Sequence, residues 1–138
     1  MQLSEISIRD GYANMNFVEV AQMLSQAVWS RGIGIEKVKQ SAANSALVVG
    51  AFHEEVQVGY ARVISDKTRF AYIADVYVDD HFRHNGIAKQ MMTYILSHES
   101  LDDVQQWLLR SAADELYEKV GFVPLSEPER WMELRKKR

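Results

Sequence analysis

Asp75-Val76-Tyr77-Val78, followed closely by Arg83-His84-Asn85-Gly86-Ile87-Ala88, is the stretch that decides the fold. The first run reads as an apolar strand, and apolar residues recur at helical spacing after the glycine, at Ile87, Met91, Met92, Ile95 and Leu96. A glycine turn between a strand and a helix exposes backbone N–H groups at the positive end of the helix dipole. The stretch therefore predicts a cradle for an anion such as a phosphate, although a glycine in such a loop is more often plain turn chemistry.

The length, composition and charge of the chain limit its class. With 138 residues, 47% of them hydrophobic, the chain is long enough to bury one sizeable core and too short for two ordinary domains. We expect a single domain over residues 1–138. The formal net charge of −3 argues against non-specific binding to nucleic acids, and the basic run 135–138 reads as a solvated terminus.

Features typical of metal, disulfide and membrane proteins are missing from the sequence. Without cysteine, neither a disulfide framework nor a thiolate zinc site can form. The histidines at positions 53, 81, 84 and 98 lack the paired spacing of a metalloprotease, so no metal is expected. No apolar run is long enough to span a bilayer, and residues 1–5 do not resemble a signal peptide. We therefore expect a soluble cytoplasmic protein.

The first part of the chain predicts two helices and an antiparallel meander. Apolar periodicity indicates a short strand at residues 6–8, a helix over 17–28 and a second helix over 35–42. Three strands separated by tight turns are then expected, at 47–52, 56–64 and 70–78.

The second part predicts a parallel crossover. A helix is expected from the glycine loop to about His98, followed by a strand at 104–109, a right-handed unit that places the loop at the carboxyl end of the first strand. A helix at 112–120 is expected to end at Gly121, before a closing pair of strands at 122–125 and 131–134. The predicted fold is α/β (α+β), a mixed, mostly antiparallel twisted sheet of six to seven strands flanked by about four helices.

Two motifs in this order resemble the GNAT family of N-acetyltransferases. The phosphate loop of that family has an arginine or glutamine, then a glycine, then a glycine or alanine, which Arg83, Gly86 and Ala88 match. A later family signature matches Leu116-Tyr117-Glu118-Lys119-Val120-Gly121-Phe122. The segment 107–131 also resembles a bacterial subgroup whose acceptors are largely unassigned, but it carries Arg110, Ala112 and Asp114 where that subgroup usually has threonine, aspartate and histidine.

The resemblance implies that the chain binds acetyl-CoA as co-substrate. The backbone of the loop would hold the pyrophosphate, and the preceding strand would pair with the pantetheine arm. An N–H near Val76 could also steady a developing oxyanion. The cofactor-binding residues implied in this way are Val76, Tyr77, Val78, Arg83, His84, Asn85, Gly86, Ile87, Ala88 and Lys89.

The resemblance also implies an acid, and the chemistry requires a base. Tyr117 is placed near the sulfur of CoA, where its phenol can protonate the departing thiolate; the alternative is a tyrosine packed in the core. Asp75 is the candidate base for the acceptor ammonium, and a structural carboxylate that bonds a loop is an equal alternative. Trp29 is the candidate wall of the acceptor pocket, although such a tryptophan is more often core.

These residues together predict an acetyl-CoA-dependent transferase that acts on the primary amine of a small molecule by direct attack in a ternary complex. No acyl-enzyme is expected, because the chain has no cysteine nucleophile. A protein-modifying acetyltransferase and a non-catalytic CoA-binding module are the alternatives. The family frequently dimerises, so a homodimer is among the expected states.

Overall fold

The computed structural model describes residues 5–136. Most of the N-terminal stretch judged for a signal peptide, and the last two residues of the basic C-terminal run, lie outside the described residues. Nine helices and strands and four short 3-10 turns follow one another along the described chain. The helices and strands are β1 (Ile6–Asp10), α1 (Phe17–Gln26), α2 (Ile35–Ala43), β2 (Leu47–His53), β3 (Val56–Ser65), β4 (Phe70–Val78), α3 (Ile87–Leu96), β5 (Gln106–Leu108) and α4 (Asp114–Glu118).

The strands form one mixed sheet in the order β1-β2-β3-β4-β5. The first four strands are antiparallel neighbours, and β5 pairs with β4 in parallel. The parallel pair encloses α3 as its crossover helix, so the predicted strand–helix–strand unit and the mixed α+β class are both confirmed. Among residues 5–136, no helix is long and apolar enough to cross a membrane.

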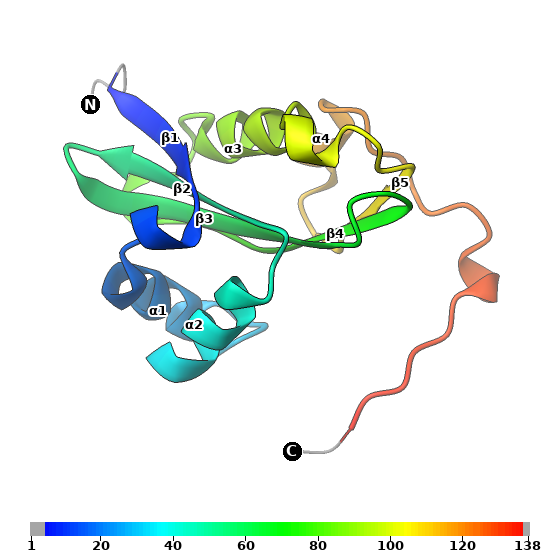
Figure 1. The fold of residues 1–138 in the computed structure, drawn as a ribbon, viewed down its shortest axis with the longest axis horizontal. Coiled ribbons are helices and arrows are strands. Elements are labelled where there is room, and N and C mark those ends of the chain that lie inside the picture. Colours follow the sequence, from blue (N-terminus) through cyan, green and yellow to red (C-terminus); the bar gives the residue numbers. More distant parts are fainter. Residues whose placement is uncertain (1–4, 137–138) are drawn as a thin grey trace.

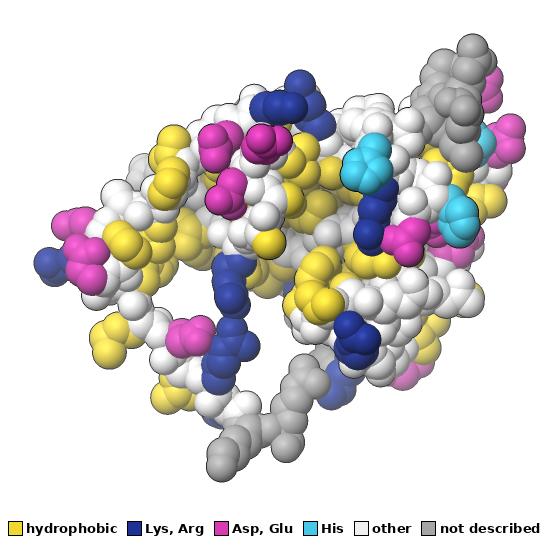
Figure 2. Space-filling view, turned by 180° about the vertical axis from the view of Figure 1, so that it is seen from behind, with side chains coloured by type: hydrophobic (Ala, Val, Ile, Leu, Met, Phe, Trp, Pro, Cys, Tyr) yellow, Lys and Arg dark blue, Asp and Glu magenta, His cyan; other side chains and the backbone are white. Residues whose placement is uncertain are grey.

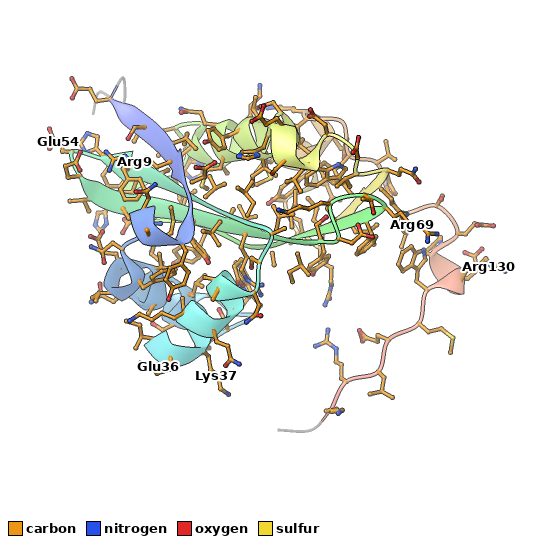
Figure 3. The ribbon with its side chains drawn as sticks, viewed as in Figure 1. Arg9, Glu36, Lys37, Glu54, Arg69 and Arg130 are labelled. Carbon is orange, nitrogen blue, oxygen red and sulfur yellow. The ribbon has the colours of Figure 1, made fainter. Side chains whose placement is uncertain are left out.

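Helices cover both faces of the sheet (Figure 1). On one face, α3 packs a core around Ile87, Met91, Met92 and Ile95, and Tyr117 of α4 belongs to the same core. On the other face, α1 and α2 bury Val20, Leu24 and Val38 against the sheet. Figure 3 shows Glu36 and Lys37 on the side of α2 away from the sheet, as the amphipathic pattern requires.

One residue interrupts the regular alternation of β4. Asp75 has a φ of 57°, and the register between β3 and β4 shifts between Tyr60 and Arg62. Before this bulge Ile73 faces the α3 core, and after it Val76 and Val78 pack against that core. The bulge therefore inserts one extra residue into β4. As a result, the side chains after Asp75 do not continue the alternation between the two faces of the sheet that holds before it.

The predicted strand count was too high. The closing strands expected at 122–125 and 131–134 do not form, and the sheet has five strands. The physical reason is visible in Figure 1, where the chain after α4 leaves the sheet edge and projects away from it. Alternating apolar residues favour a strand only when a neighbouring strand accepts their hydrogen bonds, and this segment meets none in the described chain.

Candidate active site

The glycine loop forms an open nest of backbone donors at the start of α3. Gly86 is the N-cap residue, with a φ of 77° and a ψ of 12°, and no side chain caps the helix. His84 is also left-handed, with a φ of 67°. Within the described residues, no hydrogen bond occupies the N–H groups from His84 to Lys89. The first turn of α3 carries no acidic residue, so the donors and the helix dipole favour an anion.

Space is left where an anion would approach this loop. A Cβ built on Gly86 would meet no atom within 4 Å. The side chain of Asn85 is tied back against the loop, because its amide donates to the carbonyls of Phe82 and Arg83 at 3.1 and 2.8 Å. The amide of Asn85 therefore does not occupy the free N–H groups of the loop, which fits a cradle for phosphate oxygens.

Arg83 anchors the loop to the end of β4. Its Nε donates to the carbonyl of Val78 at 2.9 Å, and its Nη1 lies 2.9 Å from Asp80. The guanidinium carbon lies 5.0 Å from the centroid of the Tyr77 ring. Arg83 therefore fixes the loop to β4 through its side chain, and the backbone N–H groups of the loop stay free.

The loop adjoins an open strand edge. β5 pairs with β4 only at Phe70, Ala71 and Tyr72, whereas β4 continues to Val78. Residues 73–78 therefore have no further described strand on that side. An open edge of this kind offers main-chain donors and acceptors to an extended ligand. Val76, Tyr77 and Val78, which the sequence singled out, all lie on this part of β4.

Two other predicted residues meet at the bulge of β4. The indole Nε1 of Trp29 donates to Oδ1 of Asp75 at 3.0 Å, and Nε of Arg62 donates to Oδ2 at 2.7 Å. The Asp75 side chain is 14% exposed, while Trp29 is 55% exposed. Trp29 also makes an edge contact with Tyr77, at 6.4 Å between ring centroids. Trp29 is therefore held in place by Asp75 and Tyr77, and the rest of its indole ring is open to solvent.

Sequence reasoning missed Arg62 and Tyr60. Arg62 is the one charged residue of β3, and a charge in a mostly buried strand signals a buried partner. Tyr60 is fully buried, and its hydroxyl has no hydrogen-bond partner among the described residues. Burial raises the pKa of Tyr60 far above its ordinary value.

Tyr117 lies on the opposite face of the sheet from Trp29. It is 8% exposed, belongs to the α3 core and meets Phe122 edge-on, with ring centroids 6.2 Å apart. Burial raises the pKa of its phenol, and the nearby Ser111 hydroxyl acts in the opposite direction. The hydroxyl therefore keeps its proton throughout the neutral range and remains a proton donor.

The sequence and the fold both match proteins that are assigned to the acetyltransferases. A family model described as an acetyltransferase (GNAT) domain matches residues 44–124. A protein of Xanthomonas campestris pv. campestris assigned to the GNAT family is 30% identical, with 98% of this chain and 96% of that chain covered at a TM-score of 0.88. A GNAT family protein of Streptococcus pneumoniae has the same fold, with 22% identity, 96% and 98% coverage and a TM-score of 0.75.

Two curated relatives match over part of their own length. A Prochlorococcus marinus protein named as an uncharacterized ycf52-like N-acetyltransferase is 31% identical over 86 residues, which are 59% of this chain and 47% of that protein. A ycf52 protein of Gracilaria tenuistipitata var. liui is 26% identical over 83% of this chain and 64% of its own length. The chain thus spans about half to two thirds of the length of these two relatives.

Proposed function

Because this chain belongs to the GNAT family of acetyltransferases, we propose that it transfers an acetyl group from acetyl-CoA to the primary amine of a small molecule. The observation that carries the proposal is the juxtaposition of two unsatisfied backbone surfaces. The free N–H groups of residues 84–89 lie at the end of the strand whose edge is open over residues 73–78. One surface suits a pyrophosphate and the other suits an extended amide-containing arm.

Acetyl-CoA supplies an acyl group activated as a thioester, with a thiolate as leaving group. The backbone from Arg83 to Lys89 would hold its phosphates, and Gly86 lets the backbone approach them because no Cβ intervenes. The open edge at Val76–Val78 would fix the arm by main-chain hydrogen bonds. An N–H near Val76, beside the bulge, would donate to the acyl carbonyl oxygen where negative charge develops.

Tyr117 is the proposed acid. Its phenol is neutral and buried, so the proton is retained until a thiolate develops nearby. Replacing it with phenylalanine removes the proton and preserves most of the packing against Phe122. We expect Tyr117→Phe to bind acetyl-CoA as the wild type does and to lower turnover by about 100-fold or more, within the range of general acid catalysis.

Asp75 and Trp29 would form the acceptor side. Each oxygen of the Asp75 carboxylate accepts one hydrogen bond and keeps a further lone pair, so Asp75 can still receive the proton of an ammonium directly or through a water. The exposed face of Trp29 offers a cation–π contact to the same ammonium. The charge and the aromatic surface together favour a cationic acceptor.

A substitution separates the two roles open to Asp75. Asp75→Asn keeps the size of the side chain and its bond from Trp29 but cannot take a proton. If Asp75 is the base, the variant should regain turnover as rising pH deprotonates the amine in solution. If it only holds Trp29 and Arg62, the variant should have a lower melting temperature and an unchanged pH profile.

The proposal is tested by release of free CoA. Purified protein, acetyl-CoA and a panel of primary amines are combined with a thiol reagent, which meets no protein background because the chain contains no cysteine. We expect amine-dependent thiol release by the wild type and a large loss in Tyr117→Phe. Acetyl-CoA binding without release with any amine would favour a protein acceptor or a non-catalytic module, and equal release by Tyr117→Phe would refute the acid role.

A further inference from the structure

Arg62 lies on β3 at the point where the helical cover of the sheet ends. Along this face of the strand the exposed fraction rises from 0% at Tyr60 to 16% for the Arg62 side chain and 43% at Ile64. The residues that pair with Arg62 and Ile64 in β4 are Ala74 and Tyr72, which are only half-buried. Directly opposed residues share a face of the sheet. Arg62 therefore borders a partly uncovered, apolar area of the sheet.

The guanidinium of Arg62 is fixed in place and still has free donors. Its Nε donates to Oδ2 of Asp75 at 2.7 Å, and its Nη1 donates to the hydroxyl of Ser45 at 3.3 Å. That hydroxyl donates in turn to the carbonyl of Ser41 at 2.8 Å, which holds it against α2. A guanidinium has five N–H groups. Both N–H groups of Nη2 and one of Nη1 therefore have no partner among the described residues.

These free donors can be reached from outside. Among residues 5–136, the hydroxyl oxygen of Tyr60 is the one buried side-chain nitrogen or oxygen atom without a hydrogen-bond partner. Because Nη2 of Arg62 has no partner either, it must lie at the surface. A guanidinium that two hydrogen bonds already hold loses little further freedom on binding, and its planar fork matches a carboxylate. Arg62 therefore offers a small anion site beside Asp75 and Trp29.

An amine without an anionic group fits this pair of charges poorly. Oδ2 of Asp75 lies 2.7 Å from Nε of Arg62, so an ammonium that approaches Asp75 also approaches a like charge. A carboxylate on the same acceptor would place the opposite charge beside each member of the pair. On the face of the molecule that Figure 2 shows, both acidic and basic side chains border the hydrophobic ones. An acceptor that carries both charges meets no net repulsion there.

We propose that the acceptor is a zwitterion in which an amine and a carboxylate lie close together, as in an α-amino acid, and that Arg62 binds the carboxylate. This inference rests on the proposed acetyl transfer and names the substrate class of the same site. The ammonium meets Asp75 and the exposed face of Trp29, and the carboxylate accepts the N–H groups of Nη2. The rest of the acceptor extends over the apolar area at Ile64 and Tyr72.

The carboxylate takes no part in the bonds that change. The ammonium gives up one proton before its nitrogen attacks the acetyl carbon, and a second as the bond from that carbon to sulfur breaks. The thiolate leaves and takes up a proton, so the products are an N-acetyl amino acid, free CoA and one released proton. Arg62 thus contributes to binding and orientation of the acceptor and not to proton transfer.

Release of free CoA with matched acceptors tests recognition of the carboxylate. The full chain is assayed with acetyl-CoA and a panel of L-amino acids, each compared with its carboxamide and with the amine that lacks the carboxyl group. One such set is L-leucine, L-leucinamide and isopentylamine, which share a side chain and a primary amine. We expect kcat/KM to be about 10- to 100-fold higher for the amino acids, the range of a hydrogen bond between charged groups. Equal or better use of the amides and simple amines would overturn the proposal and leave the acetyl transfer standing.

Arg62→Lys tests the role of Arg62 itself. Lysine keeps a positive charge beside Asp75 but lacks the second arm of the fork, so the variant should fold with a similar melting temperature. The preference for an amino acid over its amide should disappear through a higher KM, whereas kcat/KM for isopentylamine should stay close to that of the wild type. The control is Arg9→Lys, the same change at an arginine that pairs with Glu55, and it should keep the preference. A preference that survives in Arg62→Lys would overturn the proposal.

Binding distinguishes failure of this inference from failure of the proposed activity. Isothermal titration of the same amino acids and amides into protein mixed with CoA reports recognition of the carboxylate without turnover. Binding of an amino acid but not of its amide, lost in Arg62→Lys, would support the carboxylate site even if no acetyl group is transferred. If no amino acid of the panel binds or is acetylated, the proposal is overturned.

Discussion

Replacing Gly86 with alanine tests the cradle at the residue where its geometry is most exacting. The backbone is left-handed there, and an L side chain in that conformation costs about 1–2 kcal/mol. The new methyl group meets no protein atom within 4 Å, so it would project into open space beside the free N–H groups. We expect it to displace a bound phosphate from one donor, a loss of about 1.5–3 kcal/mol, or about 10- to 150-fold in the dissociation constant of acetyl-CoA.

Gly32→Ala is the matched control. Gly32 has a φ of 78°, and its Cβ would also meet no atom within 4 Å, but it lies between α1 and α2. Both variants should lose a similar few degrees in melting temperature, whereas only Gly86→Ala should lose affinity in isothermal titration with acetyl-CoA. Wild-type affinity in Gly86→Ala, or an equal loss in the control, would refute the assignment of the loop as a phosphate cradle.

Three further predictions concern stability. Arg62→Met should lower the free energy of unfolding in urea by about 3 kcal/mol, because it leaves the largely buried Asp75 carboxylate without its cation. A double variant that adds Asp75→Asn should recover part of that loss. If it recovers nothing, the ion pair with Asp75 is not the reason why Arg62 stabilises the fold. Tyr60→Phe should raise the free energy of unfolding by about 1 kcal/mol, because it removes a buried hydroxyl with no partner; a less stable variant would point to a hidden partner of the hydroxyl. Asp66 accepts hydrogen bonds from the backbone of residues 68–70, which hold its pKa at about 2, below the usual 3.8. A carboxyl whose pKa is lower in the folded state stabilises the protein at pH values above its unfolded pKa, and this stabilisation is lost as the pH falls through the folded pKa. The melting temperatures of wild type and Asp66→Asn should therefore differ near neutral pH and converge between pH 4 and 2. A difference that stays constant with pH would contradict this prediction.

The parts of the fold that were predicted correctly depend on local patterns. The apolar run before Gly86 and the helical spacing after it identify β4 and α3, and the connection between them then requires a parallel neighbour. Gly86 was informative because its backbone is left-handed, a conformation that favours a residue without a Cβ. These signals lie within a few residues of one another, where a single sequence is most informative.

The features that were missed depend on contacts between distant segments. The bulge at Asp75 shifts the strand by one residue, and periodicity alone does not reveal an inserted residue. Arg62 of β3 meets Asp75 of the neighbouring β4, and Trp29 reaches the same carboxylate from the turn that follows α1. The strands expected at 122–125 and 131–134 have suitable side chains but no neighbour in the described chain, and a sequence pattern does not show whether a partner exists.

Transfer of an isotopically labelled acetyl group from acetyl-CoA is the direct test of the proposed acetyltransferase activity. Labelled acetyl-CoA and purified protein are incubated with a metabolite extract, and mass spectrometry follows the label, with Tyr117→Phe in parallel. We expect a labelled amide that forms with the wild type and whose rate of formation falls by about 100-fold with the variant. If acetyl-CoA neither transfers its label nor raises the melting temperature by binding the native state, the loop at Gly86 is not a binding site for acetyl-CoA and the proposed activity is refuted.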